Sequence, residues 1–514
     1  MRQAAAVVCV VTLLPLLASA QTPAVGPLTL EQVLALAEER SESIAIARAG
    51  IRHAEGEDVR ARSGLFPQLS VSFSYDRALA SEFEGVFDDV GFGGEPGVEE
   101  LPFGRKNTFR VNLALSQNLY SGGRIGAQRD LALAGRESAL LGLVTSRAQL
   151  LFDVTQAYYN AALSDRLVAI AEATVGQATA TLRQTEAGFQ AGTQPEFEVL
   201  RARVSRDTQN PNLIRQRVNR EVALLRLKQL LDLPADQDIA LADSLSGDAA
   251  APPVFAARVL PIEAAIQVSD PVQVALRAPA PQVDRAPVKQ AATAVSLREA
   301  ALAAAKAERM PSVALTSLYG RVAYPDNFLP TFGLLNWTVG VNVQMPLLTG
   351  GRQRGDELVA TADLEQARVQ LRQAEELAAL DTRSALAELV AARAAWEATA
   401  GTVEQATRAY EIADVRFQAG VSTQLERSDS RLLLQQAEAN RAQAGRDLQV
   451  ARARVALLPD LPIGAGGTGQ GGGQQQFTPP PPAAPSQPAP QTGTGQLRNA
   501  AVSPGGVQQL GGTQ

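Results

Sequence analysis

The sequence predicts a mainly α-helical, internally duplicated protein that also contains a small number of β-strands, and three observations support this fold class. A four-residue phrase occurs twice, as Phe189-Gln190-Ala191-Gly192 and as Phe417-Gln418-Ala419-Gly420, and the same offset of 228 residues carries Gly122-Gly123-Arg124 onto Gly350-Gly351-Arg352. Apolar residues recur every seven positions before each phrase, and four other stretches alternate between apolar and polar residues. Since loops tolerate changes of length, the equal spacing of these markers indicates a continuous helix in each half.

The first 20 residues have the pattern of an export signal. An early charge, Arg2, precedes an apolar run from Ala4 to Leu17, and Ala18-Ser19-Ala20 provides a small-residue cleavage site. The run is short for a membrane anchor, which needs about 20 apolar residues. The single cysteine, Cys9, lies inside this segment, so we expect a mature chain without thiols.

Composition argues against several classes of function. One histidine, His53, and no mature cysteine leave little material for metal ligation or histidine-dependent catalysis, so we expect no enzyme, metal or cofactor. The net charge is −6 and no basic block occurs, so we expect no nucleic-acid partner.

The first half begins with an amphipathic helix over residues 28–64, which ends before Pro67 because proline disfavours helix in the preceding residue. Strands follow at about 68–76 and 108–119, joined by a Gly-rich loop at 79–106.

The second half repeats the hairpin after Pro311, with strands at about 312–321 and 336–346 joined by a loop at 324–334. Each strand has about ten residues, which spans a bilayer when tilted, although a soluble sheet with one wet face would show the same alternation. Four strands cannot close a barrel, so membrane insertion would require several chains to share one.

A very long helix follows each Gly-Gly turn. Strict seven-residue steps lead from Val168 to Phe189 and from Trp396 to Phe417, which predicts left-handed supercoiling. The whole first helix, from about Gly123 to Gln190, would be roughly 100 Å long. Returning helices follow both phrases, and Pro211 in the first of them predicts a kink or local break.

These patterns divide the chain into five segments. They are a signal peptide (1–20), a first repeat with its tip near 192 (21–233), a Pro- and Ala-rich connector (234–287), a second repeat with its tip near 420 (288–458) and a disordered tail rich in Gly, Gln and Pro (459–514).

Three motifs, together with the duplication, carry a resemblance that covers Leu28 to Leu458: Phe66-Pro67-Gln68-Leu69, Leu119-Tyr120-Ser121-Gly122-Gly123-Arg124 and Arg416-Phe417-Gln418-Ala419-Gly420. The chain resembles the TolC-type outer-membrane efflux proteins. The resemblance implies a homotrimer whose four strands per chain form a 12-stranded barrel in outer-membrane lipid, with the coiled-coil helices forming a periplasmic α-barrel. It also implies an exit duct energised by an inner-membrane pump of the RND, ABC or MFS type and reached through a periplasmic adaptor (membrane fusion) protein.

The resemblance also assigns roles to individual residues. It implies adaptor contact by the two tips, at Phe189, Gly192, Arg416, Phe417 and Gly420, and a periplasmic constriction at Glu426 and Asp429, with Glu198 as the one matching acid of the first half. The strand–helix junctions are Pro67, Gly122, Gly123, Pro311, Gly350 and Gly351.

Two positions depart from the family pattern. Ser422 stands where some members have arginine, and Phe417 lacks the hydroxyl of the tyrosine found there, which places a closing network of that type in doubt. The competing hypothesis is a periplasmic or surface coiled-coil scaffold or adaptor without a pore, but it does not explain two alternating hairpins between proline and Gly-Gly junctions.

Overall fold

The computed structural model describes residues 27–80, 107–243, 245, 250–268, 284–324 and 333–464. The first half forms helices and one strand hairpin: α1 (Leu30–Arg40), α2 (Glu42–Ser63), β1 (Gln68–Arg77), β2 (Asn107–Tyr120), α3 (Arg124–Gln190) and α4 (Glu196–Leu230). The connector contributes α5 (Pro253–Val268). The second half repeats the order: α7 (Ala286–Ala307), β3 (Ser312–Ala323), β4 (Leu334–Gln344), α8 (Arg352–Gln418) and α9 (Gln424–Leu457).

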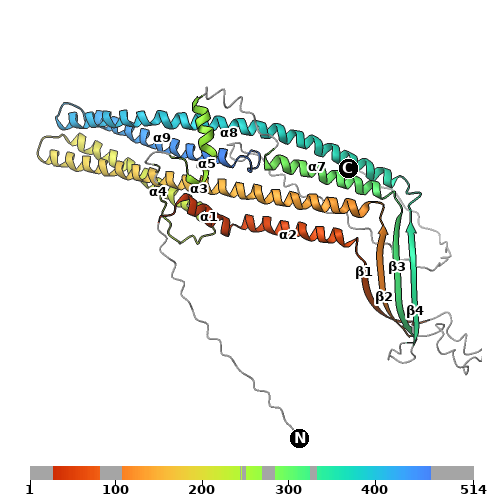
Figure 1. The fold of residues 1–514 in the computed structure, drawn as a ribbon. Coiled ribbons are helices and arrows are strands. Elements are labelled where there is room, and N and C mark those ends of the chain that lie inside the picture. The colour runs from red at the N-terminus through yellow and green to blue at the C-terminus, as the bar shows by residue number, and fades with distance from the viewer. Residues whose placement is uncertain are drawn as a thin grey trace, which may run out of the picture. The chain divides into compact units, whose positions relative to one another are not determined.

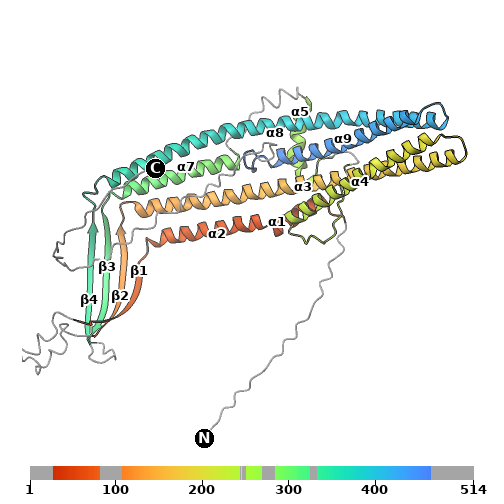
Figure 2. The ribbon, with the colours of Figure 1, turned by 180° about the vertical axis from the view of Figure 1, so that it is seen from behind.

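The duplication is present in the backbone as well as in the sequence. Helices α3 and α8 contain 67 residues each. Both begin after two glycines in the left-handed region, with φ of 62° and 89° at Gly122 and Gly123 and of 58° and 90° at Gly350 and Gly351. Figures 1 and 2 show both helical hairpins turning at the end opposite to the four strands.

Two details of the helices differ from the prediction. The helix expected over 28–64 is divided at Ser41, whose side chain accepts a hydrogen bond from the Ile44 amide at 3.5 Å and so caps α2. Of the kink or local break predicted at Pro211, the break is absent, because α4 continues from Glu196 to Leu230. Pro211 lies on an exposed face, and the loss of one intrahelical donor does not end the helix there.

The four strands form one antiparallel sheet in the order β1-β2-β3-β4, and their bounds follow the predicted ones closely. The register aligns Val71 with Leu113, Leu113 with Tyr319 and Tyr319 with Trp337. Because side chains alternate between faces, this register gathers most of the apolar residues of the four strands on one face, although Leu318 and Val322 of β3 lie on the other. Much of that face is exposed, including Val71 at 72% and Trp337 at 67%, and the outer edges of β1 and β4 are unpaired within the described chain.

The main hydrophobic core lies where α1, the middle of α3 and the carboxyl ends of α4 and α9 meet, around the fully buried Tyr158, Leu227 and Val33. Buried charges join the connector and α7 to this region. Arg452 on α9 pairs with Glu263 on α5 at 2.6 Å. Asp381 on α8 accepts from Arg285 and from Arg454, at 2.8 Å each.

Several predicted features lie outside the described residues. These are the signal peptide, nearly all of the loop at 79–106, most of the loop at 324–334 and the tail from residue 465. Among the described residues, no helix combines the length and the apolar character needed to cross a lipid bilayer.

The duplicated acids Asp153 and Asp381 lead to opposite expectations for the same substitution. Burial raises the pKa of Asp153. The hydrogen bond from Gln149 and the charge of the nearby Arg226 act in the opposite direction but are weaker. A raised folded-state pKa means that the charged form destabilises the fold, and that this cost develops as pH rises through the folded pKa. Asp381, in contrast, balances two buried arginines.

We therefore predict that Asp153→Asn stabilises the protein at neutral pH and that its advantage disappears below the ordinary carboxyl pKa. Asp381→Asn should destabilise it by about 3–5 kcal/mol, because the buried Arg285 loses its carboxylate and the buried Arg454 keeps only Glu388. Thermal unfolding of both variants between acidic and neutral pH measures the difference, and a destabilising Asp153→Asn would contradict the interpretation.

Candidate functional site

The two hairpin tips share one turn geometry. Gly192 and Gly420 have φ of 75° and 72°. In the first tip, the Gly192 amide donates to Phe189 at 3.0 Å and the Thr193 amide donates to Gly188 at 2.9 Å. The second tip repeats this pair of bonds, with Gly420 to Phe417 at 3.0 Å and Val421 to Arg416 at 2.9 Å. This is a Schellman motif, which requires positive φ after the helix.

Gly192 and Gly420 are required because their φ is positive, and not because a side chain would clash with a neighbour. No atom lies within 4 Å of the position that a Cβ would take at Gly192 or at Gly420. The repeated phrase thus encodes a sharp reversal between long helices, at the place where the sequence predicted the tips.

A buried arginine organises the second tip. Arg427 on α9 is 8% exposed, and its Nε lies 2.6 Å from Asp414 on α8. Its guanidinium carbon lies 5.0 Å from the centre of the Phe417 ring. A terminal nitrogen donates to the Thr181 hydroxyl on α3 at 3.4 Å, so one side chain contacts both of the helical hairpins.

Sequence reasoning missed Arg427 and Asp414. The signal that could have found Arg427 is the comparison of the two copies, because its counterpart at the offset of 228 is the apolar Val199. Val199 packs with Leu182 and Ala202 in a small hydrophobic cluster of the first hairpin. The second hairpin therefore has a charge where the first has a core residue.

The predicted constriction residues lie in different environments. Glu426 accepts a hydrogen bond from Ser422 at 3.0 Å and pairs with Arg416 at 3.3 Å. Asp429 is exposed and, within the described part of the chain, has no ion pair or side-chain hydrogen bond. The two residues that depart from the family pattern, Ser422 and Phe417, thus take part in contacts of the tip, with Glu426 and with Arg427.

In the first tip, Glu198 lies 4.0 Å from Arg201, and its Oε2 atom is buried without a hydrogen-bond partner in the described residues. The two tips therefore differ in charge. In the first tip, Glu198 lies beside Arg201 of the same helix. In the second tip, Glu426 is paired with Arg416, and the exposed carboxylate of Asp429 follows about one helical turn later.

The strand–helix junctions hold the sheet against the helices. Pro67 lies between the end of α2 and the start of β1, and Pro311 directly precedes β3. At Gly122 a Cβ would lie 2.3 Å from the Cβ of Met310, so the first junction also needs glycine for close approach. At Gly350 the space is open, and only the positive φ applies.

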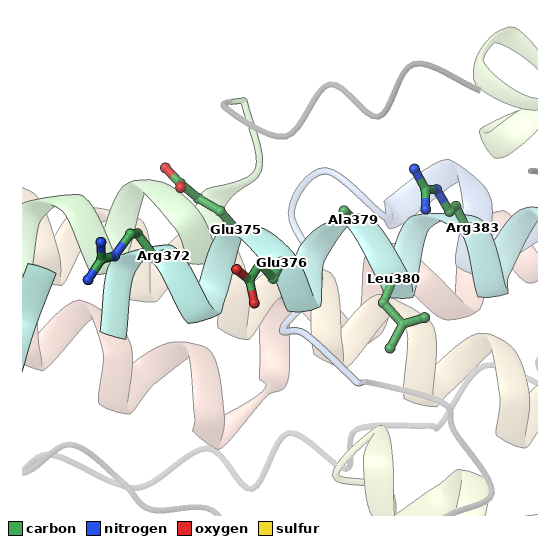
Figure 3. Close-up of a pocket in the computed structure, with 6 residues that line it drawn as sticks. All are labelled: Arg372, Glu375, Glu376, Ala379, Leu380 and Arg383. Atoms are coloured by element: carbon green, nitrogen blue, oxygen red, sulfur yellow. The ribbon is translucent and has the colours of Figure 1, made fainter. Parts of the chain in front are cut away.

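The rest of the described surface offers no catalytic arrangement. A shallow depression of about 410 Å³ is lined by α8 alone, through Arg372, Glu375, Glu376, Ala379, Leu380 and Arg383. Figure 3 shows Leu380 and Arg383 pointing in opposite directions from the helix, so these side chains do not converge on a common point. No group of metal-ligating side chains occurs in the described ranges.

The comparison with protein families identifies the chain. The model of the outer membrane efflux proteins matches residues 33–232 and 282–470. The chain belongs to the outer membrane efflux protein family. It is a non-enzymatic exit duct of the outer membrane whose helical part lies in the periplasm, and proteins of this family form trimers that act with adaptor and inner-membrane pump partners. The competing hypothesis of a scaffold without a pore is therefore wrong.

Individual relatives agree with this assignment. The chain is 26% identical over 427 residues to the pyoverdine export outer membrane protein OpmQ of Pseudomonas putida, covering 80% of this chain and 82% of that protein. The outer membrane channel CmeC of Campylobacter jejuni superposes with a TM-score of 0.65 at 17% identity, covering 85% of this chain and 86% of that one. The outer membrane protein VceC of Vibrio cholerae superposes with a TM-score of 0.65 at 18% sequence identity, covering 84% of this chain and 96% of that one. These channels confirm the predicted fold, with a helical periplasmic barrel and a shared β-barrel.

The contacts of Arg427 lead to a prediction about the second tip. Arg427→Leu would leave the carboxylate of Asp414 without its cation and would remove the link to Thr181, at a cost of roughly 1–3 kcal/mol. Amide hydrogen exchange in residues 177–185 and 410–431 should then accelerate by about 10- to 100-fold.

Arg408→Leu is the matched control. Arg408 lies near the same tip, on α8, but its pair with Glu411 is exposed on both sides and contributes little to stability. Equal protection in the wild type and in Arg427→Leu would show that the arginine does not hold the hairpins together.

Proposed function

We propose that the tip of the α8–α9 hairpin is the periplasmic gate of this exit duct. The observation that carries the proposal is the set of contacts made by Arg427 close to the turn. It joins α9 to α8 through Asp414 and α9 to α3 through Thr181. A gate needs a closed state held by few contacts, so that a partner can release it. A single arginine at the junction of two hairpins has that property.

Release of these contacts would separate α9 from α3 without unfolding either helix. The main hydrophobic core lies far along the chain from the tip, around Tyr158 and Leu227. Among the described residues, the buried apolar cluster near the turn of the first hairpin consists only of Leu182, Val199 and Ala202. The tips are thus held by fewer buried apolar residues than the middle of the helices, as expected for a part that moves.

The paired acids Glu426 and Asp429 supply the charge of the gate. They are three residues apart on α9, which places them on one face of the helix. In a trimer, six such carboxylates would surround the closed end and favour cations over anions. Glu198 would contribute less because Arg201 lies beside it.

The same tips are proposed to contact a periplasmic adaptor. Phe189 is 46% exposed, and Val421 in the second turn is 70% exposed, so each turn presents apolar surface next to Gly192 or Gly420. The energy for export would come from an inner-membrane pump of the RND, ABC or MFS type.

The division of the chain into segments also remains a proposal. Residues 1–20 would direct export and be removed, the repeats 21–233 and 288–458 would build the duct, and 234–287 would join them. Disorder was predicted for the whole tail, 459–514, but its start is packed, because Leu461 is 1% exposed and belongs to the main hydrophobic core; residues 465–514 lie outside the described residues. Sequence composition supports these assignments.

The gate proposal predicts unequal roles for the two acids. Asp429→Asn should lower cation selectivity more than Glu426→Gln, because Arg416 already offsets part of the Glu426 charge. The double substitution to alanine should have the largest effect. Reversal potentials across a salt gradient in planar bilayers measure the selectivity.

Glu39→Gln serves as the control, because it removes an exposed carboxylate from α1, outside both tips. Reversal potentials that remain unchanged in the double variant would refute the acidic ring.

The adaptor proposal is tested at the turn. Gly420→Val places a branched side chain at positive φ, at a cost of roughly 1–3 kcal/mol, and should distort the turn enough to weaken cross-linking to the adaptor while the trimer remains assembled. Gly355→Val, at a helical position of α8 with open space around it, should leave cross-linking unchanged. Loss of the trimer in Gly420→Val would mean that the glycine is structural only.

A further inference from the structure

A polar cavity of about 90 Å³ lies between the two helical hairpins. Its lining comes from four helices, with Gln177 on α3, Gln209 on α4, Tyr410 on α8, and Arg427 and Arg431 on α9 among the residues that face it. The cavity therefore exists only where the first and second hairpins pack together.

The charge of the lining is positive. Two arginines and no aspartate or glutamate line the cavity. Arg427 is balanced by Asp414 at 2.6 Å. Arg431 has no ion-pair partner among the described residues, its Nε atom is buried without a hydrogen bond, and its guanidinium carbon lies 5.2 Å from the centre of the Tyr410 ring.

The duplication explains why Arg431 has no acid. Its counterpart in the first hairpin is Arg203, which pairs with Glu186 at 3.3 Å. The counterpart of Glu186 is Asp414, but in the second hairpin that carboxylate pairs with Arg427, which stands where the first hairpin has Val199. The second hairpin thus has one acid for two arginines at these positions, and Arg431 has no carboxylate partner among the described residues.

The size of the cavity suits a small ion. A buried water needs roughly 10–15 Å³ of such space, so the cavity holds either about six to nine waters or one compact anion with part of its hydration shell. Guanidinium groups bind oxyanions through two parallel hydrogen bonds, and side-chain amides supply further donors.

We propose that this cavity binds a small inorganic oxyanion of the size of phosphate or sulfate. Arg431 holds the anion from α9, and the amides of Gln177 and Gln209 donate to it from the first hairpin. A bound anion joins the two hairpins and stabilises their packing. This binding is independent of whether the tip acts as the gate, so it is tested without measuring transport.

The test is a calorimetric titration of the detergent-solubilised full-length trimer with sodium phosphate. Ionic strength is kept constant with sodium gluconate, whose anion is too large for the cavity. The wild type should bind one phosphate per chain saturably. Arg431→Gln should weaken the affinity by about tenfold or more, because it removes a charged hydrogen-bond donor.

Arg203→Gln is the matched control, since it removes the equivalent charge from the first hairpin, outside the cavity, and should leave the affinity unchanged. Gln209→Leu provides a second variant from the opposite hairpin and should also weaken binding, which keeps the test valid if Arg431→Gln fails to assemble. The proposal is overturned if the wild type shows no saturable heat, if both cavity variants bind as the wild type does, or if Arg203→Gln weakens binding as much as they do.

Discussion

Helices α3 and α8 each run for 67 residues without interruption, and a straight helix of that length reaches roughly 100 Å. Because α3 and α8 are equally long, the turns and the strands at their two ends lie at matching positions in the two halves. Each added residue would turn the following side chains by about 100° and would move the apolar seam away from its partner. Equal lengths allow the two hairpins to lie in register, with the turns at Gly192 and Gly420 at one end and the strands at the other (Figures 1 and 2).

The two copies have helices of equal length, but side chains at equivalent positions make different contacts. Asp153 lies in a partly buried site that raises its pKa, whereas Asp381 binds two buried arginines. Near the tips, Glu186 pairs with an exposed arginine, whereas Asp414 pairs with a buried one. In both comparisons the acid is retained and its partners have changed. The first copy therefore keeps the simpler packing, and the second carries the denser network of charges.

The fold was predictable because each of its elements has a local pattern. Alternation of apolar and polar residues reports the pleat directly, so the four strands begin and end close to the predicted positions. Glycine pairs and the repeated phrase mark conformations that other residues adopt only under strain. The division at Ser41 was missed, because the apolar stripe continues across it and the interruption is confined to one residue, with a ψ of 124°.

The candidate site was less predictable, because its contacts join distant parts of the chain. Glu426 and Asp429 share a helix face, but the sequence does not show that Arg416 lies beside the first and not the second. Arg427 reaches Thr181, a residue 246 positions away, and this contact depends on how two hairpins pack. Periodicity shows which face of a helix is apolar, and it is silent about which charges meet across that face.

The unpaired edges of β1 and β4 have a consequence for mixed populations of chains. Because neighbouring strands alternate in direction, β4 of one copy continues the sheet into β1 of the next, which is a head-to-tail joint that closes a ring. A copy with one blocked edge still enters the ring through its intact edge and leaves the barrel open for its neighbours. With equal amounts of blocked and normal chains, only about one trimer in eight would be free of a defective joint. Damage to either edge strand is therefore dominant.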